Sequence, residues 1–157
     1  MYSREEEKKL RLEFWTTFGR WCKLAPQMKG RKKSWILHHT GITDIALRFE
    51  VTRKEALVMI ELTHRDESKR LEAFGILENY RIMLEADFPQ GLDWDFYAMR
   101  NDSVKEVCRI STGYAPADYL QKKQWPLIFN FFIDNMMILE KNFQNISEMV
   151  KEELESK

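Results

Sequence analysis

TDIALRFEVTRKEALVMIELT, residues 43 to 63, is the stretch that decides the fold. Its first half alternates, as in a strand with one buried face, with apolar side chains at Ile45, Leu47, Phe49 and Val51. Arg53 and Lys54 separate it from residues 56–60, an apolar run typical of a strand that is buried on both faces. The stretch therefore predicts a β-hairpin.

The register of this hairpin follows from its short turn. A two-residue turn at 53–54 pairs Ala46 with Glu61 and places the apolar side chains of both strands on one face. The opposite face carries Glu61, an acid where another apolar residue is expected. Asp44 and Arg48 are its diagonal neighbours on that face. This polar cluster is the main candidate site of the chain.

Helix and strand signals continue on both sides of the hairpin. Ser3 and Glu6 form a capping box that opens a helix ending before Pro26, and Asp66 or Ser68 caps a second helix. Further elements are expected as strands at 35–37, 92–97 and 104–112, a short helix from Pro116, and a long helix from Pro126 toward Leu154. This order predicts an α+β fold: a mixed, largely antiparallel sheet of about five strands with helices packed on it and a long C-terminal helix.

The composition is that of a single domain covering residues 1–157. A hydrophobic content of 44% is enough for a substantial core, and no linker or repeat divides the chain. The 25 basic and 25 acidic side chains cancel, which disfavours extensive binding along a nucleic-acid backbone. A charged N-terminus and the lack of an apolar run of ~20 residues predict neither signal peptide nor membrane span. Cys22 and Cys108 have no metal-type spacing, so we expect a cytoplasmic protein with reduced thiols.

Scattered positions along most of the chain carry a family resemblance. They are Phe14-Trp15, Met59-Ile60-Glu61-Leu62, Arg70, Phe74, Leu77, Leu84-Glu85, Leu92-Asp93-Trp94, Arg109-Ile110 and residues 125–131. In these positions, between residues 10 and 143, the chain resembles the bacterial family catalogued as domain of unknown function 4268. Members of that family resemble accessory domains that are joined to, or encoded beside, nuclease-type domains. The resemblance implies a setting in nucleic-acid metabolism or defence, and no demonstrated activity.

The acids of the hairpin support a catalytic hypothesis. Asp44 and Glu61 on adjacent strands resemble the core of restriction-type nucleases, in which two acids bind Mg²⁺ and a lysine two residues after the second acid assists. Thr63 occupies the position of that lysine, and threonine has no charge to stabilise a phosphate transition state. Lys69 or Arg65 at the start of the next helix could supply the missing charge.

The same acids also support a structural hypothesis. Arg48 lies across the hairpin from Glu61, and a partly buried carboxylate needs such a partner. Because threonine replaces the lysine, the sequence favours a structural ion pair between Arg48 and Glu61 and predicts no confident metal site.

Two further acids lie where a negative charge is unfavourable. Glu85 and Asp87 come near the end of the second predicted helix, where the helix dipole disfavours anions. Either both lie past the true end of the helix, or a cation such as Arg81 or Arg109 holds Glu85.

A basic stretch without acids occupies residues 20–33. Its cations are Arg20, Lys23, Lys29, Arg31, Lys32 and Lys33. Trp21 and Trp35 flank the stretch, so it could contact phosphates while the tryptophans stack on bases. A solvated loop between two core tryptophans is the alternative, and it is favoured.

The last predicted helix bears on assembly. Residues 127–139 are apolar nearly all round, and Phe143, Ile146, Val150 and Leu154 then form a narrow stripe. The stripe either packs on the domain itself or pairs with a second copy or a partner protein.

Together these features favour an accessory or interaction domain without a complete catalytic site, associated with nuclease or defence systems. The alternatives are a metal-dependent nuclease that uses Asp44 and Glu61, and a nucleic-acid-binding module that uses the basic stretch. Only the nuclease would require a cofactor, Mg²⁺.

Overall fold

The computed structural model describes residues 2–30, 35, 40–100 and 104–156. The elements are, in chain order, α1 (Arg4–Leu24), η1 (Pro26–Met28), β1 (Ile45–Val51), β2 (Ala56–Leu62), α2 (Glu67–Glu78), α3 (Arg81–Leu84), β3 (Asp93–Met99), β4 (Glu106–Tyr114), η3 (Lys122–Gln124) and α4 (Trp125–Glu155). The two η elements are short 3₁₀ turns. The predicted α+β fold is confirmed.

The strands form one sheet in the order β1-β2-β4-β3, and every neighbouring pair is antiparallel. β1 and β2 are the predicted hairpin, and Ala46 lies opposite Glu61 as the turn requires. The described residues thus hold four strands rather than about five, and none of these pairs is parallel. Trp35 lies outside the four strands, and residues 36–37 of the strand expected there lie outside the described residues.

Two helix predictions are corrected. The segment expected as one helix is divided into α2 and α3, because Asn79 and Tyr80 donate their N–H groups three residues back, which tightens the chain. The helix expected from Pro116 does not form. There the Asp118 side chain accepts the Leu120 N–H at 2.9 Å, a local bond that competes with helical pairing. Among the described residues between Pro116 and α4, the only helical turn is η3.

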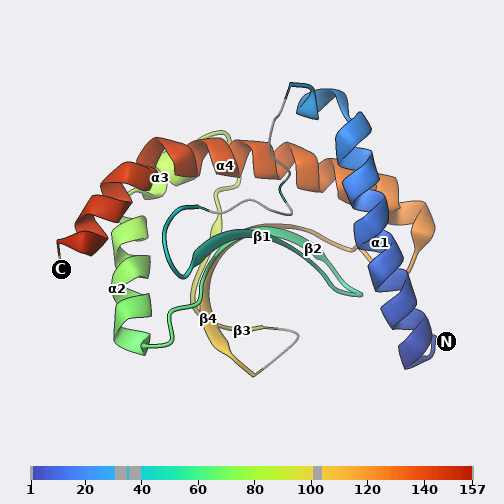
Figure 1. Cartoon of the computed structure of the whole chain (residues 1–157), viewed down its shortest axis with the longest axis horizontal. Helices are drawn as coiled ribbons and strands as arrows, with labels where there is room; N and C mark the ends of the chain where they lie inside the picture. Colours follow the sequence, from blue (N-terminus) through green and yellow to red (C-terminus); the bar gives the residue numbers. More distant parts are fainter. Residues whose placement is uncertain (1, 31–34, 36–39, 101–103, 157) are drawn as a thin grey trace.

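Figure 1 shows a strongly curved sheet with its helices on the convex side. α4 runs along that side, α1 lies at one end, and α2 and α3 lie at the other. The core between these layers is rich in fully buried side chains, among them Phe14, Phe18, Ile60, Leu62, Phe129 and Phe132. In the described part of the chain no helix covers the concave side (Figure 1), so the side chains that point there form the candidate site.

The apolar stripe of α4 is covered within the chain. Phe143, Ile146 and Val150 are buried, and the Asn142 side chain donates to the backbone oxygens of Leu84, the last residue of α3, and of Ala86. Self-packing therefore accounts for most of the stripe without a second copy. Among the described helices, none is both long and apolar enough to cross a membrane.

Candidate functional site

The concave side is centred on Glu61 of β2. Its side chain is only 1% exposed, and each carboxylate oxygen faces an arginine. Arg48 Nη1 on β1 donates to Oε2 at 2.7 Å, and Arg100 Nη2, just past β3, lies 3.4 Å from Oε1. An ion so far from water requires such compensation, because an unpaired buried charge is strongly destabilising.

A second carboxylate extends this cluster. Glu50 of β1 is also buried, and Arg109 Nη2 of β4 lies 3.4 Å from its Oε2. Arg48 Nη2 lies 4.0 Å from Glu50 Oε1 and so links the two acids. We call these five residues, from three strands and the end of β3, the arginine–glutamate network. Its three arginines and two glutamates carry one net positive charge.

This geometry does not fit the Mg²⁺ site at Asp44 and Glu61 that was considered from the sequence. Asp44 lies in the turn before β1, exposed to solvent, with a positive φ of 66°. Its backbone oxygen accepts the Thr63 N–H at 2.9 Å, while Glu61 faces two guanidinium groups. Among the described residues, no group of three or more His, Cys, Asp or Glu side chains is arranged to hold a metal ion.

The cations considered in place of the lysine lie at the start of α2. Arg65 and Lys69 are both exposed. Arg65 lines the same open cleft of about 730 Å³ as Asp44 and Thr63, together with Arg70 and Glu106. Of these two cations, Arg65 is thus the one that shares a cleft with the exposed acid, whereas Glu61 does not line this cleft.

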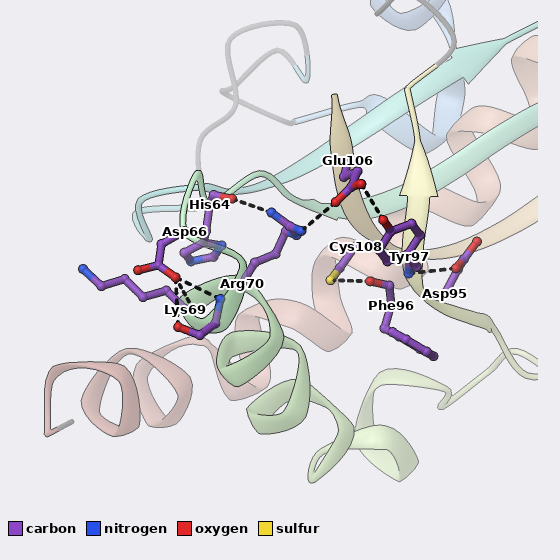
Figure 2. Close-up of polar contacts among 10 residues, drawn as sticks. His64, Asp66, Lys69, Arg70, Asp95, Phe96, Tyr97, Glu106 and Cys108 are labelled. Carbon is purple, nitrogen blue, oxygen red and sulfur yellow. Dashed lines mark hydrogen bonds and ion pairs between the residues drawn. The ribbon is translucent and has the colours of Figure 1, made fainter. Parts of the chain in front are cut away.

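A second polar cluster ties α2 to β3 and β4 (Figure 2). Arg70, with 5% of its side chain exposed, donates to the His64 backbone oxygen at 2.9 Å and lies 3.6 Å from Glu106 Oε2. Glu106 in turn accepts the Tyr97 hydroxyl, which raises the pKa of Tyr97. Burial lowers the pKa of His64 and favours its neutral form. These contacts hold the helix against the sheet.

The buried thiol of Cys108 belongs to the same cluster. Its Sγ donates to the Phe96 backbone oxygen at 3.1 Å, as Figure 2 shows. Burial raises the pKa of this thiol, although the neighbouring Arg70 opposes the rise. A thiol held in its protonated form is a poor nucleophile, so Cys108 is a packing residue.

Glu85 is held at the corner between α3 and β3. It lies at the C-cap of α3 and accepts the Leu92 N–H at 2.7 Å and the Trp94 indole N–H at 3.1 Å. Of the two cations considered for it, Arg81 is the partner, with Nε 3.3 Å from Oε1. The Leu92 N–H is the main cause that lowers the pKa of Glu85, and the bonds from Trp94 and Arg81 add to it.

Comparison with protein families assigns the chain to a known group. The family model described as Domain of unknown function (DUF4268) matches residues 10–147. The chain belongs to the DUF4268 family. The matched DUF4268 region contains all four strands and therefore the whole arginine–glutamate network. No curated protein and no solved structure gives a significant match.

The basic stretch lies within the DUF4268 match. Arg20 and Lys29 are exposed, whereas Arg31, Lys32 and Lys33 lie outside the described residues. The two flanking tryptophans point inward. Trp21 donates its indole N–H to Asn130 on α4, and Trp35, 8% exposed, donates to Glu140. Trp35 is therefore not placed for stacking on a base, whereas Trp21 is half-buried.

The sequence alone does not identify three of the five residues of the arginine–glutamate network, Glu50, Arg100 and Arg109. The pairing of β2 with β4 places Arg109 directly opposite Glu61, but this pairing is not visible in the hairpin alone.

Proposed function

We propose that this chain is a non-catalytic interaction domain that works as an accessory to a nuclease or defence system. One observation carries the proposal: the acid on which a nuclease site would depend, Glu61, is buried between two arginines. The family resemblance supplies the proposed setting.

The chemistry of the concave side supports binding rather than cleavage. A divalent cation at Glu61 would have to replace two charge-assisted contacts, from Arg48 and Arg100, in a place almost without water. Asp44 would then be its only exposed acidic ligand in the hairpin, and Thr63 would not supply the charge that a lysine provides at that position. A stable sheet with a fixed charge network is instead a rigid platform for a partner.

Plasmid cleavage with Mg²⁺ or Mn²⁺ tests the proposal. The wild type is compared with Asp44→Asn, and a restriction enzyme serves as the positive control. Asp44→Asn is the sharper variant because the side chain is exposed and asparagine tolerates its left-handed backbone. Glu61→Gln would also perturb the network. We expect no cleavage by either protein, whereas wild-type cleavage that is lost in Asp44→Asn would overturn the proposal.

The nucleic-acid-binding alternative is tested on the same preparations. Fluorescence polarisation with a labelled single-stranded oligonucleotide is measured at low and high salt, with wild type and with Arg20→Ser combined with Lys29→Ser. Phosphate contacts would make affinity fall steeply with salt. We expect no such binding. Salt-sensitive binding that the double variant weakens would favour the alternative.

A further inference from the structure

The edge strand β3 carries an apolar strip on the side of the sheet that holds the helices. Phe96 is 59% exposed, Tyr97 53% and Met99 46%. Single exposed hydrophobic residues are ordinary, but neighbouring ones mark interaction surfaces. We call these three residues the β3 strip.

A β-bulge produces the strip. Between the pairs Asp95–Arg109 and Ala98–Val107, two residues of β3, Phe96 and Tyr97, lie opposite Cys108 alone. At the bulge, successive side chains of β3 no longer alternate between the two faces of the sheet. As a result the Phe96 ring lies 6.4 Å from Phe74 of α2, and Tyr97 reaches Glu106 on the same side.

A stripe of α2 borders the strip. Glu67, Leu71, Phe74 and Glu78 are spaced at i, i+4, i+7 and i+11, which places them on one face of the helix. Phe74 contacts the strip through Phe96, and Leu71 is 38% exposed. Exposed apolar surface therefore lies on both the helix and the strand.

Two acidic side chains lie on this stripe of α2. Glu67 and Glu78 are exposed and have no ion-pair partner among the described residues. Glu67 lies on the same face of α2 as Phe74, whose ring faces Phe96 of the strip. The Glu67 carboxylate also adds to the rise in the pKa of Tyr97 that the hydrogen bond with Glu106 causes. A partner that covers the apolar surface would gain from cations at these two positions.

The same bulge disfavours a strand as the partner. The Asp95 side chain accepts the Tyr97 N–H at 3.0 Å, and bulges of this kind protect sheet edges from pairing. A helix packed on the face of β3 beside α2 needs no edge hydrogen bonds. The strip spans three residue steps, about 10 Å, which corresponds to roughly two helical turns.

We propose that the β3 strip and the Glu67–Leu71–Glu78 side of α2 dock a basic amphipathic helix of a partner protein. This inference rests on the proposed function, since it names the surface through which the interaction domain acts. The partner helix supplies apolar side chains at i, i+3/i+4 and i+7 to the strip, and lysine or arginine to the two glutamates.

The probe is a fluorescein-labelled amphipathic Leu/Lys peptide of about five turns, with a Leu/Glu peptide of the same pattern as its control. Fluorescence anisotropy is measured with the whole chain. We expect the Leu/Lys peptide to bind, and Phe96→Ser to weaken it about tenfold or more. Glu67→Gln with Glu78→Gln should weaken it severalfold and reduce its salt dependence.

Matched controls keep this test specific. Leu12→Ser removes another exposed leucine, 71% exposed on α1 at the other end of the sheet (Figure 1), and should leave binding unchanged. Met99→Ser is a second strip variant in case Phe96→Ser does not fold, which thermal melts by circular dichroism will show. Failure of the Leu/Lys peptide to bind, or equal binding of the Leu/Glu peptide, would overturn the inference.

Two other outcomes would also overturn it. Peptide binding that Phe96→Ser and Met99→Ser leave intact would place the contact elsewhere. A concentration-dependent dimer that Phe96→Ser dissociates, without peptide binding, would make a second copy the occupant. The plasmid assay on the same preparations separates these failures from that of the proposed function, because Asp44 lies outside the strip.

Discussion

The concave face and the α3–β3 corner each hold a carboxylate away from bulk water, and they do so differently. Glu61 is 1% exposed and faces two arginines of other elements, Arg48 of β1 and Arg100 just past β3. Glu85 is 21% exposed and accepts hydrogen bonds from donors within nine residues, the Leu92 backbone and the Trp94 indole. One region neutralises a buried charge with two arginines, whereas the other combines local N–H donors with one half-exposed arginine, Arg81.

This difference indicates which contacts are essential for the stability of each region. Removing a cation from Glu61 leaves a buried charge with too little compensation, and water cannot replace the lost partner. Removing the charge at Glu85 weakens hydrogen bonds that lie near the surface, where water substitutes in part. The network should therefore be the more sensitive region, and the corner should be the more dependent on pH.

The largest effect is expected from Arg48→Ala. The variant leaves Glu61 with Arg100 alone, and we expect the free energy of unfolding to fall by about 3 kcal/mol. Urea denaturation at neutral pH measures the loss. Arg53→Ala in the turn of the same hairpin is the control, since its ion pair with Glu7 is 3.6 Å long and the arginine is 58% exposed. A loss below about 0.5 kcal/mol for Arg48→Ala would show that the pair is not structural.

A smaller effect is expected from Glu85→Gln. The amide keeps one oxygen for the Leu92 or Trp94 donor but loses the charge that strengthens both bonds, so we expect a loss of about 1–2 kcal/mol. Glu72→Gln on the exposed face of α2 is the matched control. A loss at Glu85 larger than that of Arg48→Ala would reverse the order of the two regions.

The two regions also differ in how far the sequence predicts them. The pairing of Ala46 with Glu61 follows from the two-residue turn, and it brings Arg48 within reach of Glu61 because both strands are adjacent in the chain. Arg100 and Arg109 come from the second hairpin, whose place against β2 depends on the strand order. No local pattern encodes that order.

At the α3–β3 corner and in α4, too, the sequence predicts only part of the contacts. Arg81 lies four residues before Glu85, a spacing that the sequence displays, whereas the Leu92 N–H is a backbone group that no side-chain pattern marks. The stripe of α4 is likewise visible as an apolar face. What covers it, here the chain's own α2 and α3 region, is a property of the packed fold.

A pH titration sharpens the contrast. The pKa of Glu85 is lowered on folding, so its charge stabilises the fold above the ordinary pKa of 4.5, and this contribution is lost as pH falls through the lowered value. We expect the difference in unfolding free energy between wild type and Glu85→Gln to be constant from pH 7 to about 5 and to shrink as the pH falls through the lowered pKa of Glu85. Urea denaturation at several pH values measures it. A difference that grows on acidification would contradict the assigned hydrogen bonds.

The smallest effect is expected at Asp44, the exposed acid of the hairpin. Its side chain is solvated and its backbone conformation suits asparagine, so Asp44→Asn should change the free energy of unfolding by less than about 0.5 kcal/mol. Mg²⁺ at ten times the dissociation constant of a real site would stabilise the wild type by about 1.4 kcal/mol. We expect no shift in the melting temperature with millimolar Mg²⁺ in either protein, because Glu61 is already neutralised by arginine. A shift in the wild type that Asp44→Asn removes would mean that the concave face exchanges an arginine for a metal ion, and the two ways of holding a carboxylate would no longer be separate.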